Sequence, residues 1–102
     1  HVSDLVAAHA LALDHLAAGG QSLTLNCGYG RGFTVREVIS AVERVAGHAI
    51  PVVNGPRRAG DPPSIVANSA KLKQLLQWQP RYDNLDTIAT HAFAWERRLN
   101  AV

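Results

Sequence analysis

The residues best suited to chemistry in this 102-residue chain lie in one stretch, residues 56–63, which runs Pro-Arg-Arg-Ala-Gly-Asp-Pro-Pro. Its three prolines and its glycine disfavour both helix and strand, so a stiff loop is predicted. The guanidinium groups of Arg57 and Arg58 suit phosphate oxygens, and the Asp61 carboxylate can accept hydrogen bonds from vicinal hydroxyls. The loop therefore fits the phosphate and ribose of a nucleotide, although an exposed turn with an incidental ion pair fits the same residues.

A glycine-rich turn at 28–32 is the second candidate site. It follows residues 22–27, which alternate apolar and polar side chains like a strand, and it precedes a helical pattern at 35–46 and a short apolar run at 50–54. This order is that of a βαβ unit. However, a dinucleotide fingerprint needs a third glycine where Phe33 stands, and the second run ends in asparagine rather than an acid. We therefore expect no cofactor site here, and we expect the glycines to provide positive φ.

The composition argues against several other classes of site. His1, His9 and His15 are spaced by eight and six residues, which is not the spacing that places two metal ligands on one helix face. The net charge is +2 and the ten basic residues are scattered, so nucleic acid is not an expected partner. No apolar run is long enough to span a membrane, and the single Cys27 cannot form an internal disulfide. A reducing, cytoplasmic location is the expectation.

Four amphipathic helices are predicted within a single domain that has a modest core. Their predicted positions are 4–18, 35–46, a helix that opens after Asn68-Ser69, and 85–99. The expected N-caps are Ser3, Thr34 in a capping box with Glu37, Asn68-Ser69 and Asn84, and Gly47 is expected to end the second helix.

The remaining segments are expected to connect and close this core. Residues 64–67 are predicted to be a short extended piece, and Pro80 prevents the third helix from continuing. Trp78 and Trp95 each lie in an apolar pattern, so both are predicted to be core residues. Together with the two strand-like runs, this gives an α/β fold of about four helices with a few short strands.

Four segments together resemble a known enzyme family. Residues 1–9, 26–35, 57–63 and 78–80 have the order and spacing of motifs in the carboxy-terminal part of UDP-glucose 4-epimerases, which belong to the extended short-chain dehydrogenase/reductase family. The resemblance covers essentially the whole chain. It implies that residues 1–102 are a carboxy-terminal UDP-sugar-binding subdomain, and that the amino-terminal NAD-binding Rossmann half is absent from this chain.

The resemblance also implies roles for three residues in binding UDP. Arg58 matches the arginine that contacts the UDP phosphates, Asp61 matches the acid that holds the ribose hydroxyls, and Val35 matches an apolar residue near the nucleotide. Two positions depart from the family pattern. Ile65 stands where the family often has an aromatic residue, and Asn68 stands where it often has aspartate. Contacts to the sugar at position 65 are therefore in question.

The parent enzyme implied by the resemblance is an NAD-dependent isomerase that interconverts UDP-galactose and UDP-glucose in galactose metabolism. Its base is a tyrosine followed four positions later by lysine. Tyr29 is followed at that spacing by Phe33, and Tyr82 by Asp86, so no catalytic residue is assigned here. We expect the isolated chain to be inactive, to bind no cofactor or metal, and to self-associate through the face that truncation exposes.

Three other functions remain open on the sequence. The chain could be a free-standing domain that binds another phosphorylated ligand or a protein partner. It could be the corresponding fragment of another nucleotide-sugar epimerase or dehydratase. It could also be a small nucleic-acid binder that uses the helix between Thr34 and Gly47.

Overall fold

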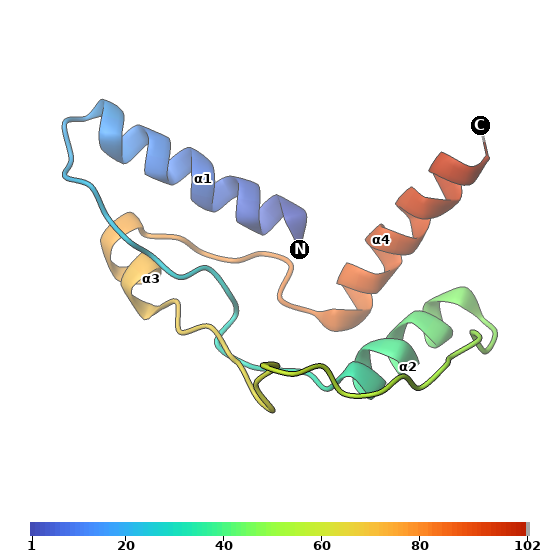
Figure 1. The fold of residues 1–102 in the computed structure, drawn as a ribbon. Helices are drawn as coiled ribbons and strands as arrows, with labels where there is room; N and C mark the ends of the chain where they lie inside the picture. Colours follow the sequence, from blue (N-terminus) through green and yellow to red (C-terminus); the bar gives the residue numbers. More distant parts are fainter. Residues whose placement is uncertain (102) are drawn as a thin grey trace. The chain divides into compact units, whose positions relative to one another are not determined.

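The computed structural model describes residues 1–101 as four α-helices joined by long irregular segments (Figure 1). The helices are α1 (Val2–Ala17), α2 (Val35–Ala46), α3 (Ala70–Leu76) and α4 (Leu85–Asn100). All four predicted helices are therefore present. Within residues 1–101 there is no strand, and the segments 22–27, 50–54 and 64–67 have no regular secondary structure. A strand is defined by hydrogen bonds to a neighbouring backbone, and in the described chain these segments have no such ladder.

The predicted caps of α2 and α4 are confirmed. Thr34 Oγ1 accepts from the Glu37 N–H at 3.2 Å, and the Thr34 N–H donates to Glu37 Oε2 at 2.6 Å. Gly47 ends α2 in the left-handed conformation, with φ of 77°. Asn84 Oδ1 accepts from the Thr87 N–H at 2.9 Å. These contacts satisfy backbone groups that have no partner inside the helix, so local sequence is enough to fix both helix starts.

The cap predicted for α1 needs correction, whereas the Asn68-Ser69 pair predicted to cap α3 is confirmed. Helix α1 begins two residues earlier than expected, and its N-cap is His1, whose Nδ1 accepts from the Ser3 N–H at 3.0 Å. Ser3 is therefore a helical residue. At α3 the cap residue is Ser69, but its side chain makes no capping bond, and the Asn68 side chain accepts from the Ala70 N–H instead. An imidazole nitrogen can substitute for a hydroxyl as the capping acceptor.

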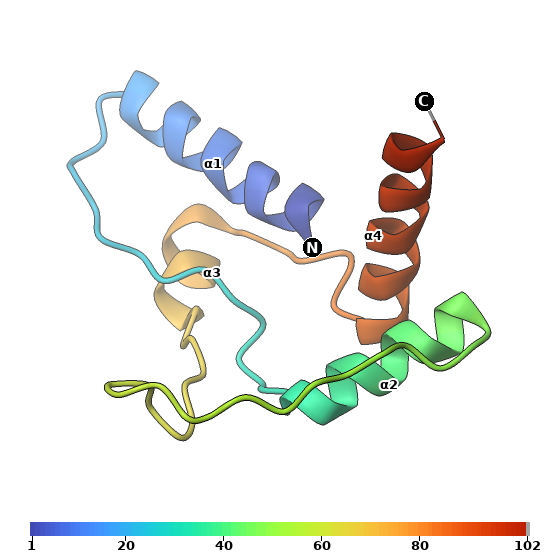
Figure 2. The same cartoon turned by 45° about the vertical axis from the view of Figure 1, so that its right-hand side comes forward.

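The chain divides into two compact units, and the first comprises residues 1–32 and 66–83. Its core consists of Ala8 of α1, Leu72 and Leu76 of α3, and Trp78, each 7% exposed or less. The half-buried side chains packed against this core are Leu11, Ala12, Leu25 and Tyr29. Figure 2 shows that the segment following α3 passes alongside α1. The prediction that Trp78 is a core residue is confirmed.

The glycine turn at 28–32 lies in this first unit and depends on small size as well as on backbone freedom. Gly30 has a φ of 80°, as the predicted positive φ requires. A Cβ at Gly28 would lie 2.7 Å from the Cβ of Ala67, and one at Gly32 would lie 3.0 Å from Val66 Cγ2. Gly28 therefore leaves no room for a side chain, and Gly32 leaves little, because another segment, 66–67, lies against the turn.

The second unit comprises residues 33–65 and the chain from 84 onward. Helices α2 and α4 pack against each other, and each buries one alanine: Ala41 and Ala89 are 0% and 6% exposed. Their small side chains let the two helices approach closely. Arg44 near the end of α2 donates to Asp86 in the first turn of α4 at 2.7 Å, which joins the helices at the surface.

The prediction that Trp95 is a core residue is wrong for this chain, because its side chain is 56% exposed. The stripe that α4 buries passes through Ala89 and the half-buried Ile88 and Phe93, so the predicted register was rotated around the helix. The guanidinium of Arg98 lies 6.0 Å from the Trp95 ring. No helix in the described part of the chain is both long and apolar enough to cross a membrane.

The two tryptophans should therefore differ in their contribution to stability. Replacing Trp78 by alanine should lower the free energy of unfolding by about 3–5 kcal/mol, because it leaves a cavity in the first unit. Trp95→Ala should cost less than about 1 kcal/mol, since the side chain is largely exposed. Urea unfolding of the 102-residue chain, followed by circular dichroism, measures both. Equal losses would contradict the assignment.

Candidate functional site

The loop at 56–63 brings together two of the three predicted binding residues. Arg58 Nε donates to Asp61 Oδ2 at 2.9 Å. The side chains are 85% and 53% exposed. Residues 59 and 60 form a turn in which Gly60 has a φ of 86°, and this turn folds the two charged side chains back onto each other. Without a ligand the loop thus has the arrangement of the alternative interpretation, an exposed turn with an ion pair, and its binding role stays a prediction.

Val35, the third predicted residue, opens α2 and is 76% exposed. It belongs to the same unit as the loop, but the described contacts of Arg58 and Asp61 do not extend to it. Ile65, just after the loop, is 83% exposed. The loop and the start of α2 thus both present side chains to solvent that a ligand could contact.

Separating the exposed Arg58–Asp61 ion pair costs little free energy. Pairs of this kind typically contribute only about 0–1 kcal/mol, because water screens the charges. A diphosphate would offer Arg58 a second, doubly charged partner of matching geometry. The Asp61 carboxylate would then be released to accept hydrogen bonds from hydroxyl groups. A ligand that carries both anionic and hydroxyl groups could therefore replace the contact between Arg58 and Asp61.

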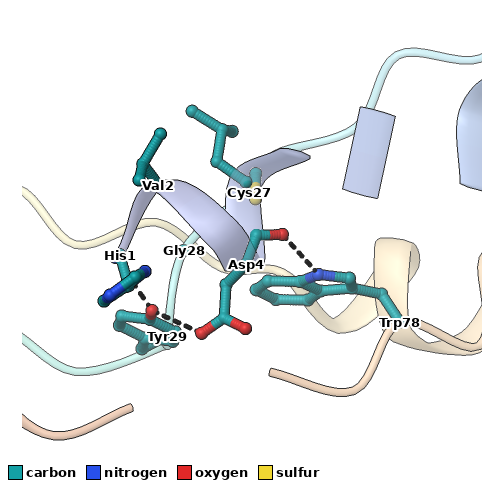
Figure 3. Close-up of a pocket in the computed structure, with 8 residues that line it drawn as sticks. His1, Val2, Asp4, Cys27, Gly28, Tyr29 and Trp78 are labelled. Carbon is teal, nitrogen blue, oxygen red and sulfur yellow. Dashed lines mark hydrogen bonds between the residues drawn. The ribbon is translucent and has the colours of Figure 1, made fainter. Parts of the chain in front are cut away.

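A second cluster, which the sequence did not predict, surrounds Asp4 in the first unit (Figure 3). Asp4 is 4% exposed, although it is charged. Its carboxylate accepts from Tyr29 Oη at 2.7 Å and from the backbone N–H groups of Arg81 and Tyr82, each at 2.9 Å. Its backbone carbonyl accepts from Trp78 Nε1 at 2.9 Å. One residue of α1 thus holds two segments that are distant in sequence.

The protonation states in this cluster are those of a structural site. Burial by itself would raise the pKa of Asp4, but hydrogen bonds from Arg81, Tyr29 and Tyr82 outweigh it and hold this pKa below its ordinary value. Burial and the hydrogen bond to Asp4 raise the pKa of the Tyr29 phenol. Burial likewise raises the pKa of the Cys27 thiol. The carboxylate is saturated with donors, and the raised pKa values of Tyr29 and Cys27 disfavour their ionised forms.

Two cavities adjoin Asp4. One of about 330 Å³ is lined by Cys27, Gly28, Tyr29, Trp78 and the start of α1, and another of about 640 Å³ lies between α1 and residues 77–82. Both are lined by the first unit alone, so neither contains the Arg58 loop. Within residues 1–101 no group of three or more metal-ligating side chains is gathered.

Local sequence patterns do not predict the Asp4 cluster. In the sequence Asp4 is only the first residue of the predicted helix 4–18, whereas its main-chain and side-chain partners lie 25 to 78 residues away. A second contact was missed for the same reason. Arg31 bonds to Asp83 across 52 residues, through Nη2 to Oδ1 at 3.0 Å and to the backbone carbonyl at 2.9 Å. The one local signal is that apolar residues directly follow Asp4 at the start of the helix.

The chain is similar to UDP-glucose 4-epimerases. It is 52% identical over 99 residues to the enzyme of Azospirillum brasilense, a match that covers 97% of this chain and 28% of the relative. It is 47% identical over 97 residues to that of Halalkalibacterium halodurans, covering 95% of this chain and 29% of the relative. The chain thus spans less than a third of the relatives it matches, and the matching stretch is their carboxy-terminal part. No protein-family model matches. The predicted resemblance is confirmed.

Solved structures give the same result. A UDP-glucose 4-epimerase crystal structure matches with a TM-score of 0.89 at 51% identity, over 96% of this chain and 30% of that one. The UDP-Glc/GlcNAc 4-epimerase of Campylobacter jejuni matches with a TM-score of 0.82 at 45% identity, again over 96% and 30%. The Brucella ovis UDP-glucose 4-epimerase, solved in complex with NAD, matches with a TM-score of 0.79 at 43% identity, over 87% of this chain and 27% of that one.

The Asp4 cluster predicts a specific pH dependence of stability. Because the folded-state pKa of Asp4 is depressed, its contribution is complete above the unfolded-state pKa of about 3.9 and is lost as the pH falls through the folded-state value. Asp4→Asn should lower the free energy of unfolding at pH 7 by about 2–3 kcal/mol, since an amide is a weaker acceptor for three donors.

Urea unfolding of both proteins between pH 7 and pH 2.5 tests this dependence. The difference between wild type and Asp4→Asn should shrink below about pH 4. Asp14→Asn, which changes an exposed aspartate of the same helix, is the control and should behave like wild type at pH 7. A difference that stays constant down to pH 2.5 would show that the charge of Asp4 is not what stabilises the unit.

Proposed function

We propose that this chain is the carboxy-terminal part of a UDP-glucose 4-epimerase and contributes the nucleotide portion of the UDP-sugar site. The observation that carries the proposal is the match to such enzymes along 97% of the chain at 52% identity. The exposed Arg58 and Asp61 side chains support it, because they supply a phosphate fork and a hydroxyl acceptor on one short loop. The whole enzyme would be an isomerase of UDP-galactose and UDP-glucose.

In this function each loop residue has a separate task. Arg58 would leave Asp61 and form charge-assisted hydrogen bonds with the diphosphate. Asp61 would accept hydrogen bonds from the ribose hydroxyls. Val35 would offer an apolar contact to the nucleotide from the start of α2, where its side chain is exposed. Ile65 is also exposed, but it provides no polar group for the sugar.

An enzyme of this kind uses NAD, which supplies the hydride acceptor for oxidation of the sugar. The residues of this chain do not fit that cofactor. The glycine turn is already occupied on one side, because Gly28 and Gly32 lie against Ala67 and Val66. We therefore assign NAD to the part of the longer protein that precedes this chain. The unpaired segments 22–27 and 50–54 would become short strands of the α/β fold there. A cytoplasmic enzyme is consistent with the single, unpaired Cys27.

One face of α1 supports the proposal that this chain works as part of a larger protein. Its large apolar side chains at helical spacing are 46–69% exposed. These are Val2, Leu5, Val6, Leu13 and Leu16. Exposed apolar surface of this kind usually marks a contact face, and the part of the enzyme absent from this chain would cover it. The isolated chain would instead bury the face against a second copy.

The first test uses the full-length gene product, with UDP titrated by calorimetry. Arg58→Ala should weaken UDP binding by roughly ten- to hundredfold, since hydrogen bonds to charged groups contribute about 1.5–3 kcal/mol. Asp61→Ala should weaken UDP binding as well, but should have much less effect on an analogue that lacks the ribose hydroxyls. Arg57→Ala is the matched control, because its neighbour makes the pair with Asp61.

Two results would contradict the assignment. An unchanged affinity in Arg58→Ala, or a larger loss in Arg57→Ala, would mean that the phosphate contact was given to the wrong residue. Epimerisation of a different nucleotide sugar in preference to UDP-galactose would favour another member of the nucleotide-sugar epimerases and dehydratases. A gene that encodes only this chain would favour a free-standing phosphate-binding domain.

The second test concerns the exposed face of α1. The isolated chain should sediment as a dimer or larger species at tens of micromolar, and Leu13→Lys should shift it toward the monomer by disrupting the apolar face. Val53→Lys serves as control, because Val53 is 93% exposed but lies outside α1. A wild-type chain that remains monomeric at this concentration would count against the proposal.

A further inference from the structure

A single hydrogen bond attaches the stretch that contains the proposed nucleotide loop to helix α2. The N–H of Ile50 donates to Glu43 Oε1 at 3.1 Å, and both residues are half-buried. Within residues 1–101 no other hydrogen bond joins the stretch 50–63 to another part of the chain. Helix α2 and this stretch both belong to the second unit, so the attachment involves that unit alone.

Glu43 also closes the turn that reverses the chain after α2. Its backbone carbonyl accepts from the Gly47 N–H at 2.9 Å, and its side chain accepts from the Ile50 N–H. Gly47 is left-handed, with a φ of 77°, so the chain leaves the helix axis at this residue. One glutamate therefore holds both ends of the reversal at 47–50.

The reversal directs the chain back along α2 toward Val35. Figures 1 and 2 both show the stretch after α2 returning alongside this helix. Glu43 lies eight residues after Val35, a rise of about 12 Å, and an extended chain covers about 12 Å in four residues. A chain that returns from Ile50 thus reaches the level of Val35 near residue 54, directly before the loop at 56–63.

The chain between Ile50 and Arg58 is suited to transmitting this position. Pro51 and Pro56 each fix one φ angle, and a proline favours extended backbone at the residue before it. Exposure rises from the half-buried Ile50 to 93% at Val53, so packing along the stretch does little to hold it in place. The position of the loop relative to the start of α2 therefore depends on where Ile50 is held.

We propose that Glu43 is a positioning residue for UDP binding, because its side-chain hydrogen bond places the nucleotide loop beside the start of α2. The proposed contact residues lie at these two places, Arg58 and Asp61 on the loop and Val35 on the helix. This inference rests on the function proposed above. Glu43 acts through the chain that follows α2 and is not itself a ligand contact. Holding the loop in place before the ligand arrives reduces the ordering cost of binding.

The experiment measures the Kd for UDP by calorimetry on variants of the full-length gene product. Glu43→Ala removes the acceptor and should weaken UDP binding by roughly three- to thirtyfold, the range typical of substitutions that act through intermediate elements. Glu43→Gln keeps an oxygen acceptor at the same place, so its Kd should stay within about threefold of wild type. Glu43→Ala should also raise the KM for UDP-galactose more than it lowers kcat.

A second background separates positioning from general destabilisation. If Glu43 acts by placing the loop, removing the binding side chains of the loop should remove its effect. In an Arg58→Ala/Asp61→Ala protein, Glu43→Ala should therefore change the Kd for UDP by less than about twofold. The melting temperature of Glu43→Ala should stay within about 4 °C of wild type, because only one half-buried hydrogen bond is lost.

The matched control is Arg44→Ala, which changes the next residue of α2. The described hydrogen bond of Arg44 goes to Asp86 of α4 at 2.7 Å rather than to the stretch after α2. This substitution should leave the Kd for UDP within about twofold of wild type. A loss as large as that of Glu43→Ala would mean that any change to α2 weakens binding, which would overturn the specific role of Glu43.

Other results would overturn the inference while leaving the proposed function intact, provided that Arg58→Ala still weakens binding. One is an unchanged Kd in Glu43→Ala. Another is an equal loss in Glu43→Ala and Glu43→Gln, which would assign the effect to the charge rather than to the hydrogen bond. An undiminished loss in the Arg58→Ala/Asp61→Ala background, or a melting temperature lowered by more than about 10 °C, would mean a structural role alone. A wild-type protein that does not bind UDP would overturn both proposals.

Discussion

The burial of one carboxylate is the constraint on which the first unit depends. A charged group that is 4% exposed is stable only if its oxygens are fully hydrogen-bonded, and Asp4 meets this condition with donors from Tyr29, Arg81 and Tyr82. The three donors come from two segments, so the glycine turn and the chain after α3 must both reach the start of α1. The core formed by Trp78 and its neighbours is assembled under this requirement, and the Trp78 ring nitrogen donates to the same aspartate.

Once the turn is held beside α1, the small size of its glycines becomes important. Gly28 and Gly32 allow residues 66 and 67 to lie against the turn, and these residues continue directly from the loop that carries Asp61. A position that serves phosphate binding in a dinucleotide fold is used here for packing between segments. The same local pattern of strand, glycines and helix is therefore compatible with two different uses, and only the neighbouring segment distinguishes them.

The proposed binding residues are held much more loosely than the core. Arg58 and Asp61 satisfy each other in the absence of ligand, and water screens the pair. This suits a residue that must exchange partners, because a buried pair would be costly to separate. Within the loop, the turn at Gly60 folds the two charged side chains toward each other. The contrast between a saturated Asp4 and a weakly paired Asp61 separates a structural carboxylate from a binding one.

Features that depend on near neighbours in the chain can be predicted without the tertiary structure. Four helices, the capping box at Thr34 and Glu37, and the charged loop at 56–63 follow from local spacing, because their hydrogen bonds span only a few residues. Tertiary structure alone decided the buried role of Asp4 and the exposure of Trp95. The partners of Asp4 lie up to 78 residues away, and helical spacing does not state which of two apolar stripes on α4 faces α2. The strands predicted at 22–27 and 50–54 illustrate the same limit, since a strand exists only where another backbone completes its ladder.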